Sequence, residues 1–120
     1  MAKRYPFISY NDEAMAAYDS DARKLDQNDV TTGRVKYLRG IMITENGGTA
    51  GTLLIYDYDT EGTDPTTTLQ RGAIYVGANS TVVVDFPAPG LKFVTGILGA
   101  LLASGATISA YSITVWGYEE

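Results

Sequence analysis

The sequence predicts an all-β fold, an antiparallel β-sandwich of the jelly-roll kind, preceded by an N-terminal arm that carries a short helix. Residues 34–118 are rich in Val, Ile, Thr, Tyr and Gly, whereas charged residues crowd the segment from 11 to 29. After residue 33, apolar segments alternate with turn residues roughly every 8–12 residues, a spacing typical of sandwiches and barrels. We therefore predict an arm over 1–33 and a β-sandwich domain over 34–120.

Segments with alternating apolar residues and β-branched content are predicted to be the strands of this domain. They are residues 35–44, 52–58, 69–76, 81–86, 91–102 and 107–118. In the first segment, alternation places four side chains on one face: Val35, Tyr37, Ile41 and Ile43. The apolar length of 91–102 also suits a helix, but Gly96 and Gly99 each cost about 1 kcal/mol in a helix interior and favour a strand with a bulge.

Local patterns also predict the connections and the burial of single strands. The Glu-Asn-Gly-Gly run at 45–48 predicts a tight hairpin turn, because Asn and Gly accept positive φ. The continuous valines at 82–84 are typical of a buried strand. Trp116 alternates with Thr114 and Tyr118, which predicts a half-buried indole ring.

The arm is predicted to be a docking element. Asn11 can cap a short helix, on which Met15, Tyr18, Ala22 and Leu25 share a narrow face that needs a partner surface. The aromatic and aliphatic residues before Asn11 also suit docking, and a seventh strand or a poorly ordered terminus are the alternatives. The candidate partner-binding residues are Tyr5, Phe7, Ile8, Tyr10, Met15, Tyr18 and Leu25.

Composition argues against most catalytic chemistry. The chain has no cysteine and no histidine, which removes thiolate zinc sites, cysteine nucleophiles and Ser-His-Asp triads. The nine lysines and arginines are scattered and the net charge is −5, so we expect no nucleic-acid partner. No apolar run reaches the ~18 residues of a membrane-spanning helix, and no membrane partner is expected. We predict that the protein is not an enzyme and needs no cofactor.

The acidic run after the second predicted strand is the best candidate for a metal site. Asp57, Asp59 and Glu61, followed by Gly62, resemble the opening of a calcium loop. Thr68 stands where such a loop places its bidentate glutamate, so a solvated acidic loop is the preferred interpretation. A glycosidase pair of Asp57 and Asp59 is disfavoured, because nothing in the sequence would separate their pKa values.

Two runs near the end of the chain resemble a known class of proteins. They are Phe86-Pro87-Ala88-Pro89-Gly90-Leu91-Lys92-Phe93-Val94-Thr95-Gly96-Ile97 and Ser104-Gly105-Ala106-Thr107-Ile108-Ser109-Ala110-Tyr111. They look like the turns and strands of small β-sandwich virion proteins of tailed bacteriophages. In those proteins, a Pro-Gly-Leu/Ile-Lys-Phe turn opens a strand that ends in a short Ser-Gly hairpin. The resemblance covers about residues 72–118 and implies a capsid decoration (cement) or related head or tail role, with no catalytic residues.

We therefore expect a structural protein of the virion, made in the host cytoplasm. Its expected partners are a major capsid protein or another virion protein, and further copies of itself, with a trimer as the first expectation. Repeated weak contacts between symmetric copies suit such a role. The alternative is a glycan- or receptor-binding module of a tail or head fibre, which the nine tyrosines would permit.

Overall fold

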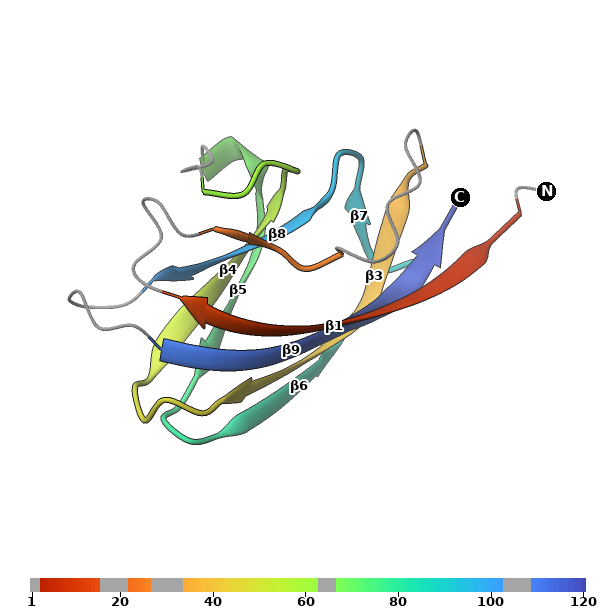
Figure 1. Cartoon of the computed structure of the whole chain (residues 1–120). Helices are drawn as coiled ribbons and strands as arrows, with labels where there is room; N and C mark the ends of the chain where they lie inside the picture. Colours follow the sequence, from red (N-terminus) through yellow and green to blue (C-terminus); the bar gives the residue numbers. More distant parts are fainter. Residues whose placement is uncertain (1–2, 16–21, 27–33, 63–66, 103–108) are drawn as a thin grey trace.

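The computed structural model describes residues 3–15, 22–26, 34–62, 67–102 and 109–120, and they form two antiparallel sheets packed face to face (Figure 1). Sheet A contains β1 (Tyr5–Met15), β9 (Ser109–Glu119), β3 (Lys36–Glu45) and β6 (Thr81–Asp85) in that order, with β7 (Leu91–Phe93) paired to β3. Sheet B contains β2 (Arg23–Lys24), β8 (Ile97–Leu102), β4 (Gly51–Asp57) and β5 (Gln70–Val76). A short 3-10 turn, Thr67–Leu69, leads into β5. The predicted β-sandwich is confirmed.

The strand pairing is nested, which makes this sandwich a jelly roll. β4 pairs with β5, β3 with β6, β2 with β8, and β1 with β9, so the chain forms one long ladder of paired segments. The ladder wraps around the core, because β9 also pairs with β3 and β8 also pairs with β4. This is the double-sheet arrangement of jelly rolls. It places the first and last strands side by side, with Tyr5 opposite Glu119 (Figure 1).

The predicted hairpin at 45–48 is wrong, because the chain passes there from one sheet to the other. β3 lies in sheet A and β4 in sheet B. The carboxylate of Glu45, which is buried at the end of β3, accepts hydrogen bonds from the backbone N–H groups of Gly47, Gly48 and Thr49. It also accepts one from Asn79 in the crossing between β5 and β6. One buried carboxylate therefore stabilises both crossings at this end of the sandwich.

A bulge in β3 changes which residues face the core. The register with β9 shifts between Leu38 and Gly40. Leu38, Ile41 and Ile43 are fully buried, whereas Tyr37 lies only half-buried. The strict alternation that placed Tyr37 with Ile41 was wrong, because one extra residue inverts the faces on either side of a bulge.

Two other segments differ from their predicted burial or continuity. The valine run at 82–84 lies in β6, an edge strand whose Val83 is 57% exposed, so only alternate valines face the core. Segment 91–102 is interrupted at 94–96 and supplies β7 to sheet A and β8 to sheet B. Its helical alternative is wrong, since both halves pair as strands.

The predicted helix from Asn11 is also wrong, and the seventh-strand alternative is correct. β1 pairs residue by residue with β9, and Asn11 lies in the middle of it. The buried Asn11 side chain donates to the carbonyl of Leu25 at 2.8 Å. A long ladder with β9 pairs the backbone groups on one side of β1 and places its inward side chains in the core, which a marginal helix would not achieve alone. The boundary near Gly33 lies outside the described residues and stays a prediction.

The core lies between the two sheets and includes residues from both sides of that boundary. Phe7 and Leu25 pack with the inward residues of β3, β4, β8 and β9. Leu25 lies against Gly99, where an added Cβ would be 2.9 Å from a Leu25 methyl group. In the described part of the chain, no helix is long and apolar enough to cross a membrane.

Candidate assembly surface

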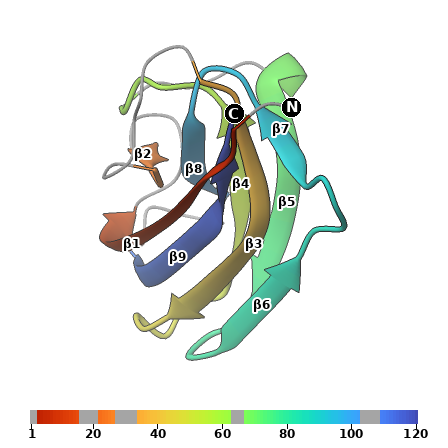
Figure 2. The same ribbon diagram turned by 90° about the vertical axis from the view of Figure 1, so that its right-hand side faces the viewer.

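The outer face of sheet A is a broad surface built from alternate residues of its strands. In β1, Phe7, Ser9 and Asn11 are buried, so Ile8 and Tyr10 point away from the core. The register of the paired strands aligns these residues with outward residues of β9, β3 and β6, so that they form rows across the sheet. In Figure 2 these strands lie in front of sheet B.

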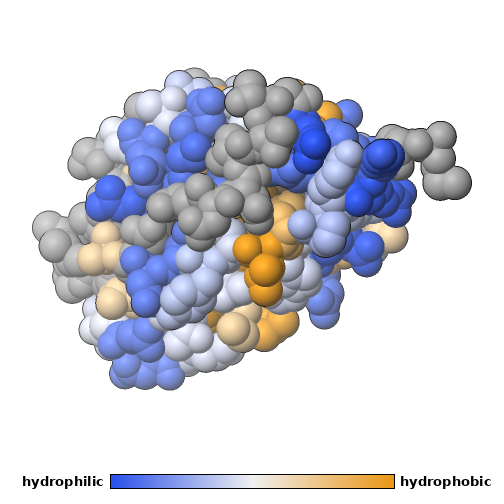
Figure 3. Space-filling view, turned by 45° about the vertical axis from the view of Figure 1, so that its right-hand side comes forward, coloured by the Kyte–Doolittle hydropathy of each residue, from blue (hydrophilic) through white to orange (hydrophobic). Residues whose placement is uncertain are grey.

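Two neighbouring rows on this face are apolar. The first runs from Ile8 to Trp116 and continues on β3 and β6 to Gly40 and the exposed, charged Asp85. The second runs from Tyr10 through Thr114 and Met42 to Val83. Ile8 is 68% exposed, Tyr10 58% and Met42 40%, so large apolar side chains meet solvent together. Figure 3 shows hydrophobic side chains gathered near the centre of this side of the molecule. A contiguous apolar patch of this kind marks an interaction surface.

Trp116 extends the patch across β3 because Gly40 leaves room for its ring. A Cβ added at Gly40 would collide with three atoms of the indole ring. The ring therefore lies directly against the β3 backbone at Gly40, and it is half-buried as predicted.

The outer face of sheet B is different, because the chain covers its central part, whereas Tyr75 and Leu102 in a neighbouring row are exposed. Its apolar residues Leu54, Tyr56 and Leu98 are buried and pack with Ala22 and Leu69. Leu69 comes from the 3-10 turn and Ala22 from the segment before β2. No such cover lies over the apolar rows of sheet A among the residues that the structure describes.

The row beyond Ile8 is aromatic and cationic. The rings of Tyr37 and Tyr118 stack at 5.0 Å, and the Arg4 guanidinium lies 4.7 Å from the Tyr118 ring centre. Arg4 also pairs with Glu120 at 3.2 Å, and the Tyr118 hydroxyl donates to the carbonyl of Pro89. These contacts fix the position of a positive charge above the sheet.

The row beyond Tyr10 is acidic and hydroxyl-rich. The Asp12 carboxylate accepts hydrogen bonds from the Ser112 and Tyr10 hydroxyls at 2.7 and 2.9 Å. These bonds lower the pKa of Asp12, with Ser112 contributing more than Tyr10. Farther along the row, the hydroxyls of Thr44 and Thr81 are 2.9 Å apart. The face therefore runs from positive through apolar to negative along the strands.

The structure separates the seven predicted partner-binding residues. Ile8 and Tyr10 lie on the outer face of sheet A, and Tyr5 lies at its end beneath the Arg34 guanidinium, 3.9 Å from the ring centre. Phe7 and Leu25 were wrongly assigned to docking, because both are buried in the core. Tyr18 and the Met15 side chain lie outside the described residues.

The sequence reasoning missed Met42, Val83 and Trp116 as members of the surface. Each comes from a different strand, and each reaches the patch through pairing with a distant strand. The one sequence signal for this face was the alternation of Trp116 with Thr114 and Tyr118, which predicted a half-buried indole ring.

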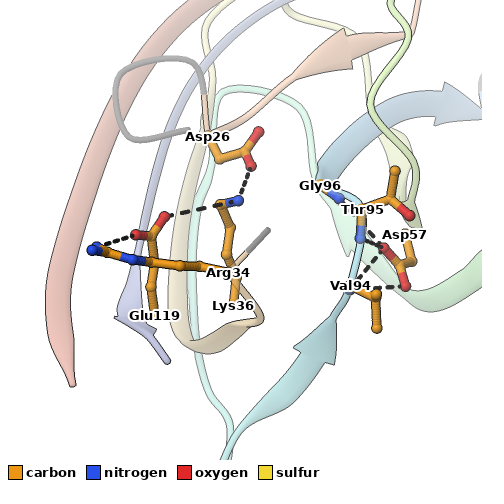
Figure 4. A network of polar contacts seen from close by, with 8 residues as sticks. All are labelled: Asp26, Arg34, Lys36, Asp57, Val94, Thr95, Gly96 and Glu119. Atoms are coloured by element: carbon orange, nitrogen blue, oxygen red, sulfur yellow. Dashed lines mark hydrogen bonds and ion pairs between the residues drawn. The ribbon is translucent and has the colours of Figure 1, made fainter. Parts of the chain in front are cut away.

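A buried group of charges joins the ends of several strands (Figure 4). The Lys36 ammonium lies 3.6 Å from Asp26 and 3.8 Å from Glu119, and Arg34 lies 3.5 Å from Glu119. Burial raises the pKa of the Asp26 carboxyl, and the positive charge of Lys36 opposes that rise. The group ties the segment after β2 to the start of β3 and the end of β9.

The three acids of the calcium candidate do not form a site. Asp57 points into the fold, where its carboxylate accepts backbone N–H groups of Val94 and Thr95 (Figure 4). It also pairs with Arg71 at 3.7 Å. Asp59 and Glu61 are exposed. In the described ranges no three acidic side chains gather as a metal site. Asp57 instead holds the turn between β7 and β8.

The solved structures similar to this chain include two from viruses. No protein-family model and no curated protein matches the sequence. A chain from the capsid asymmetric unit of cyanophage Pam1 is similar, with a TM-score of 0.47 and 15% identity over 97% of this chain and 85% of that one. The tobacco streak virus coat protein has a TM-score of 0.36 and 16% identity over 90% of this chain and 85% of that one. The strand order defines the fold independently of these similarities.

Proposed function

We propose that this protein is a non-enzymatic structural component of a virion, and specifically a capsid decoration (cement) protein. In this role it binds the capsid surface and neighbouring copies of itself. The observation that carries the proposal is the uncovered apolar face of sheet A, with Ile8, Tyr10 and Met42 exposed side by side. A soluble chain that exposes such a patch gains free energy by covering it with a partner.

The rest of the molecule supports a structural role. Double-sheet jelly rolls occur in viral capsid and lectin domains, which makes the fold compatible with the proposal without deciding it. The buried acids Glu45 and Asp57 both accept backbone N–H groups of connections, so each stabilises the shape of the sandwich. The resemblance of residues 72–118 to virion proteins of tailed bacteriophages supports a location in the virion. The trimer expected from the sequence is untested, and the two-fold pair proposed below is an alternative to it.

The glycan-binding alternative has weaker support. The exposed tyrosines Tyr10 and Tyr75 lie on opposite sheets, so they do not share one sugar-stacking site. Arg4 already lies over one face of the Tyr118 ring. A glycan array tests this alternative directly.

Co-expression with the major capsid protein encoded nearest to its gene tests the proposed function. We expect the protein to co-sediment with assembled shells. Tyr10→Asp and Met42→Asp should weaken this binding, whereas Tyr75→Asp, on the outer face of sheet B, should leave it unchanged. A folded wild-type protein that stays in the supernatant beside intact shells would contradict the proposal.

A further inference from the structure

We propose that the outer face of sheet A binds the same face of a second copy, about a two-fold axis that lies across the strands. This inference deepens the proposed function, on which it rests, by naming one partner of that surface. It follows from the order of the rows on the face, which makes the surface complementary to itself after a half-turn.

The four rows have a simple order along β1. The cationic row holds Pro6, Tyr118 and Tyr37, with the Arg4 guanidinium over Tyr118. Next come the first apolar row, from Ile8 to Trp116, and the second apolar row, from Tyr10 to Val83. The acidic row is last and holds Asp12, Ser112, Thr44 and Thr81.

A two-fold axis across the strands, passing between the two apolar rows, reverses this order in the partner. The first apolar row of one copy then faces the second apolar row of the other. The cationic row faces the acidic row, and symmetry repeats that contact. Arg4 of each copy thus approaches Asp12 of the other.

Charge selects this axis over the other face-to-face arrangement. An axis along the strands would place each cationic row on the other cationic row, and each acidic row on the other acidic row. Like charges face to face cost free energy, whereas opposite charges fix register and orientation. Both charges reach the surface, because the Arg4 side chain is 65% exposed and the hydrogen bonds to Asp12 favour its ionised form. Arg4 pairs with Glu120 within its own chain, so contact with Asp12 of the second copy adds to that exposed ion pair or replaces it.

The size of the face predicts a weak contact between two copies. The four rows extend about 20 Å along the strands and about 15 Å across four strands. That footprint, about 300 Å² on each copy, is smaller than a standard specific interface and is typical of a weak, transient contact. We therefore expect a reversible dimer at micromolar or higher concentrations, which becomes effective when many copies are arrayed on one surface.

Sedimentation equilibrium of the full chain over a wide concentration range measures the contact. Wild-type protein should show a monomer–dimer equilibrium, and Ile8→Asp should abolish the dimer. Tyr10→Ser should weaken it, whereas Tyr75→Ser removes a comparably exposed tyrosine from the other sheet and should have no effect. The emission of the single tryptophan, Trp116, should shift to shorter wavelength as the dimer forms, because the first apolar row loses water.

Charge reversal tests the axis itself. Arg4→Asp and Asp12→Arg should each raise the dimer dissociation constant about tenfold, since each disturbs two symmetric contacts. The double variant should return to within about threefold of wild type, whereas Asp59→Arg, at an exposed site outside the face, should change little. Circular dichroism verifies folding of every variant.

Outcomes of these measurements separate this inference from the proposed function. A wild-type protein that stays monomeric, or forms a trimer, would overturn the two-fold contact. A double variant no better than the single ones would overturn it as well. Shell co-sedimentation retained by such proteins would leave the decoration function standing, whereas a correct dimer that never binds shells would remove the function alone.

Discussion

The ammonium group of Lys36 lies 3.6 Å from the Asp26 carboxylate, and both side chains are buried. Asp26 follows the short strand of sheet B, whereas Lys36 begins β3 in sheet A. The pair therefore joins the two sheets at the end of the sandwich where the chain termini lie. Glu119, 3.8 Å from the same ammonium group, extends the contact to the last strand.

Replacing the lysine should destabilise the fold strongly. Lys36→Met leaves Asp26 without its buried cation, so we expect the free energy of unfolding to fall by about 3–5 kcal/mol. Urea denaturation measures the change. Lys92→Met removes an exposed lysine from the neighbouring strand β7 and should change stability by less than about 0.5 kcal/mol. Equal losses in the two variants would contradict a structural role for the buried pair.

The Asp26 carboxyl should give the folding stability a defined pH dependence. Burial raises its pKa above the ordinary value of 3.8, so the folded state holds this proton more tightly than the unfolded state. Its contribution is fully present below the unfolded pKa and is lost as pH rises through the folded pKa. The stability of wild type minus that of Asp26→Asn should therefore fall as pH rises. Denaturation curves between about pH 3 and 7 measure this difference, and a flat or rising difference would refute it.

The Glu45 carboxylate should stabilise the connections at the opposite end of the sandwich. Glu45→Gln keeps the shape of the side chain but removes the charge that accepts N–H groups of Gly47, Gly48 and Asn79. We expect a loss of about 1.5–3 kcal/mol, the value of hydrogen bonds to a charged group. Asp85→Asn, at an exposed site of β6, is the control and should be nearly neutral. Faster amide exchange at Gly47 and Asn79 in the Glu45 variant would support the assignment.

A methyl group at Gly40 should displace the indole ring of Trp116. Gly40→Ala places a Cβ where the ring lies, so we expect a cost of about 1–3 kcal/mol and a shift of tryptophan emission to longer wavelength. Gly72→Ala is the matched control in a strand, because nothing lies within 4 Å of its added Cβ. Unchanged emission in Gly40→Ala would show that the ring does not rest on this glycine.

Removal of residues 1–33 should unfold the rest of the chain. The deletion removes the 11-residue strand that pairs with β9, together with the core residues Phe7 and Leu25. A chain that begins at Arg34 is expected to lose its cooperative thermal transition. Leu25→Ala in the full chain should cost about 2–5 kcal/mol. A truncated chain that still unfolds cooperatively would instead support the independent domain over 34–120.

The local pattern of the chain determines its fold class. Apolar alternation and turn residues are short-range signals, so most strands and the sandwich could be predicted from them. The positions of β4, β5 and β9 follow the predicted segments closely. The structural role of Asp57 in the acidic loop could not be predicted from local pattern. The backbone N–H groups that donate hydrogen bonds to its carboxylate belong to Val94 and Thr95, far along the chain.

Tertiary structure decided what local pattern leaves open. Residues 11–15 form a strand because β9, about a hundred positions later, offers an edge to pair with. The same long-range pairing turns a local hairpin signal at 45–48 into a crossing between sheets. It also brings Ile8, Met42 and Trp116 onto one face, although each strand carries only one or two outward apolar residues. The sequence by itself determined most of the segments that extend after residue 34. The extension of residues 11–15, the register and the sheet membership depend on pairing across the whole chain, and these placed the apolar face.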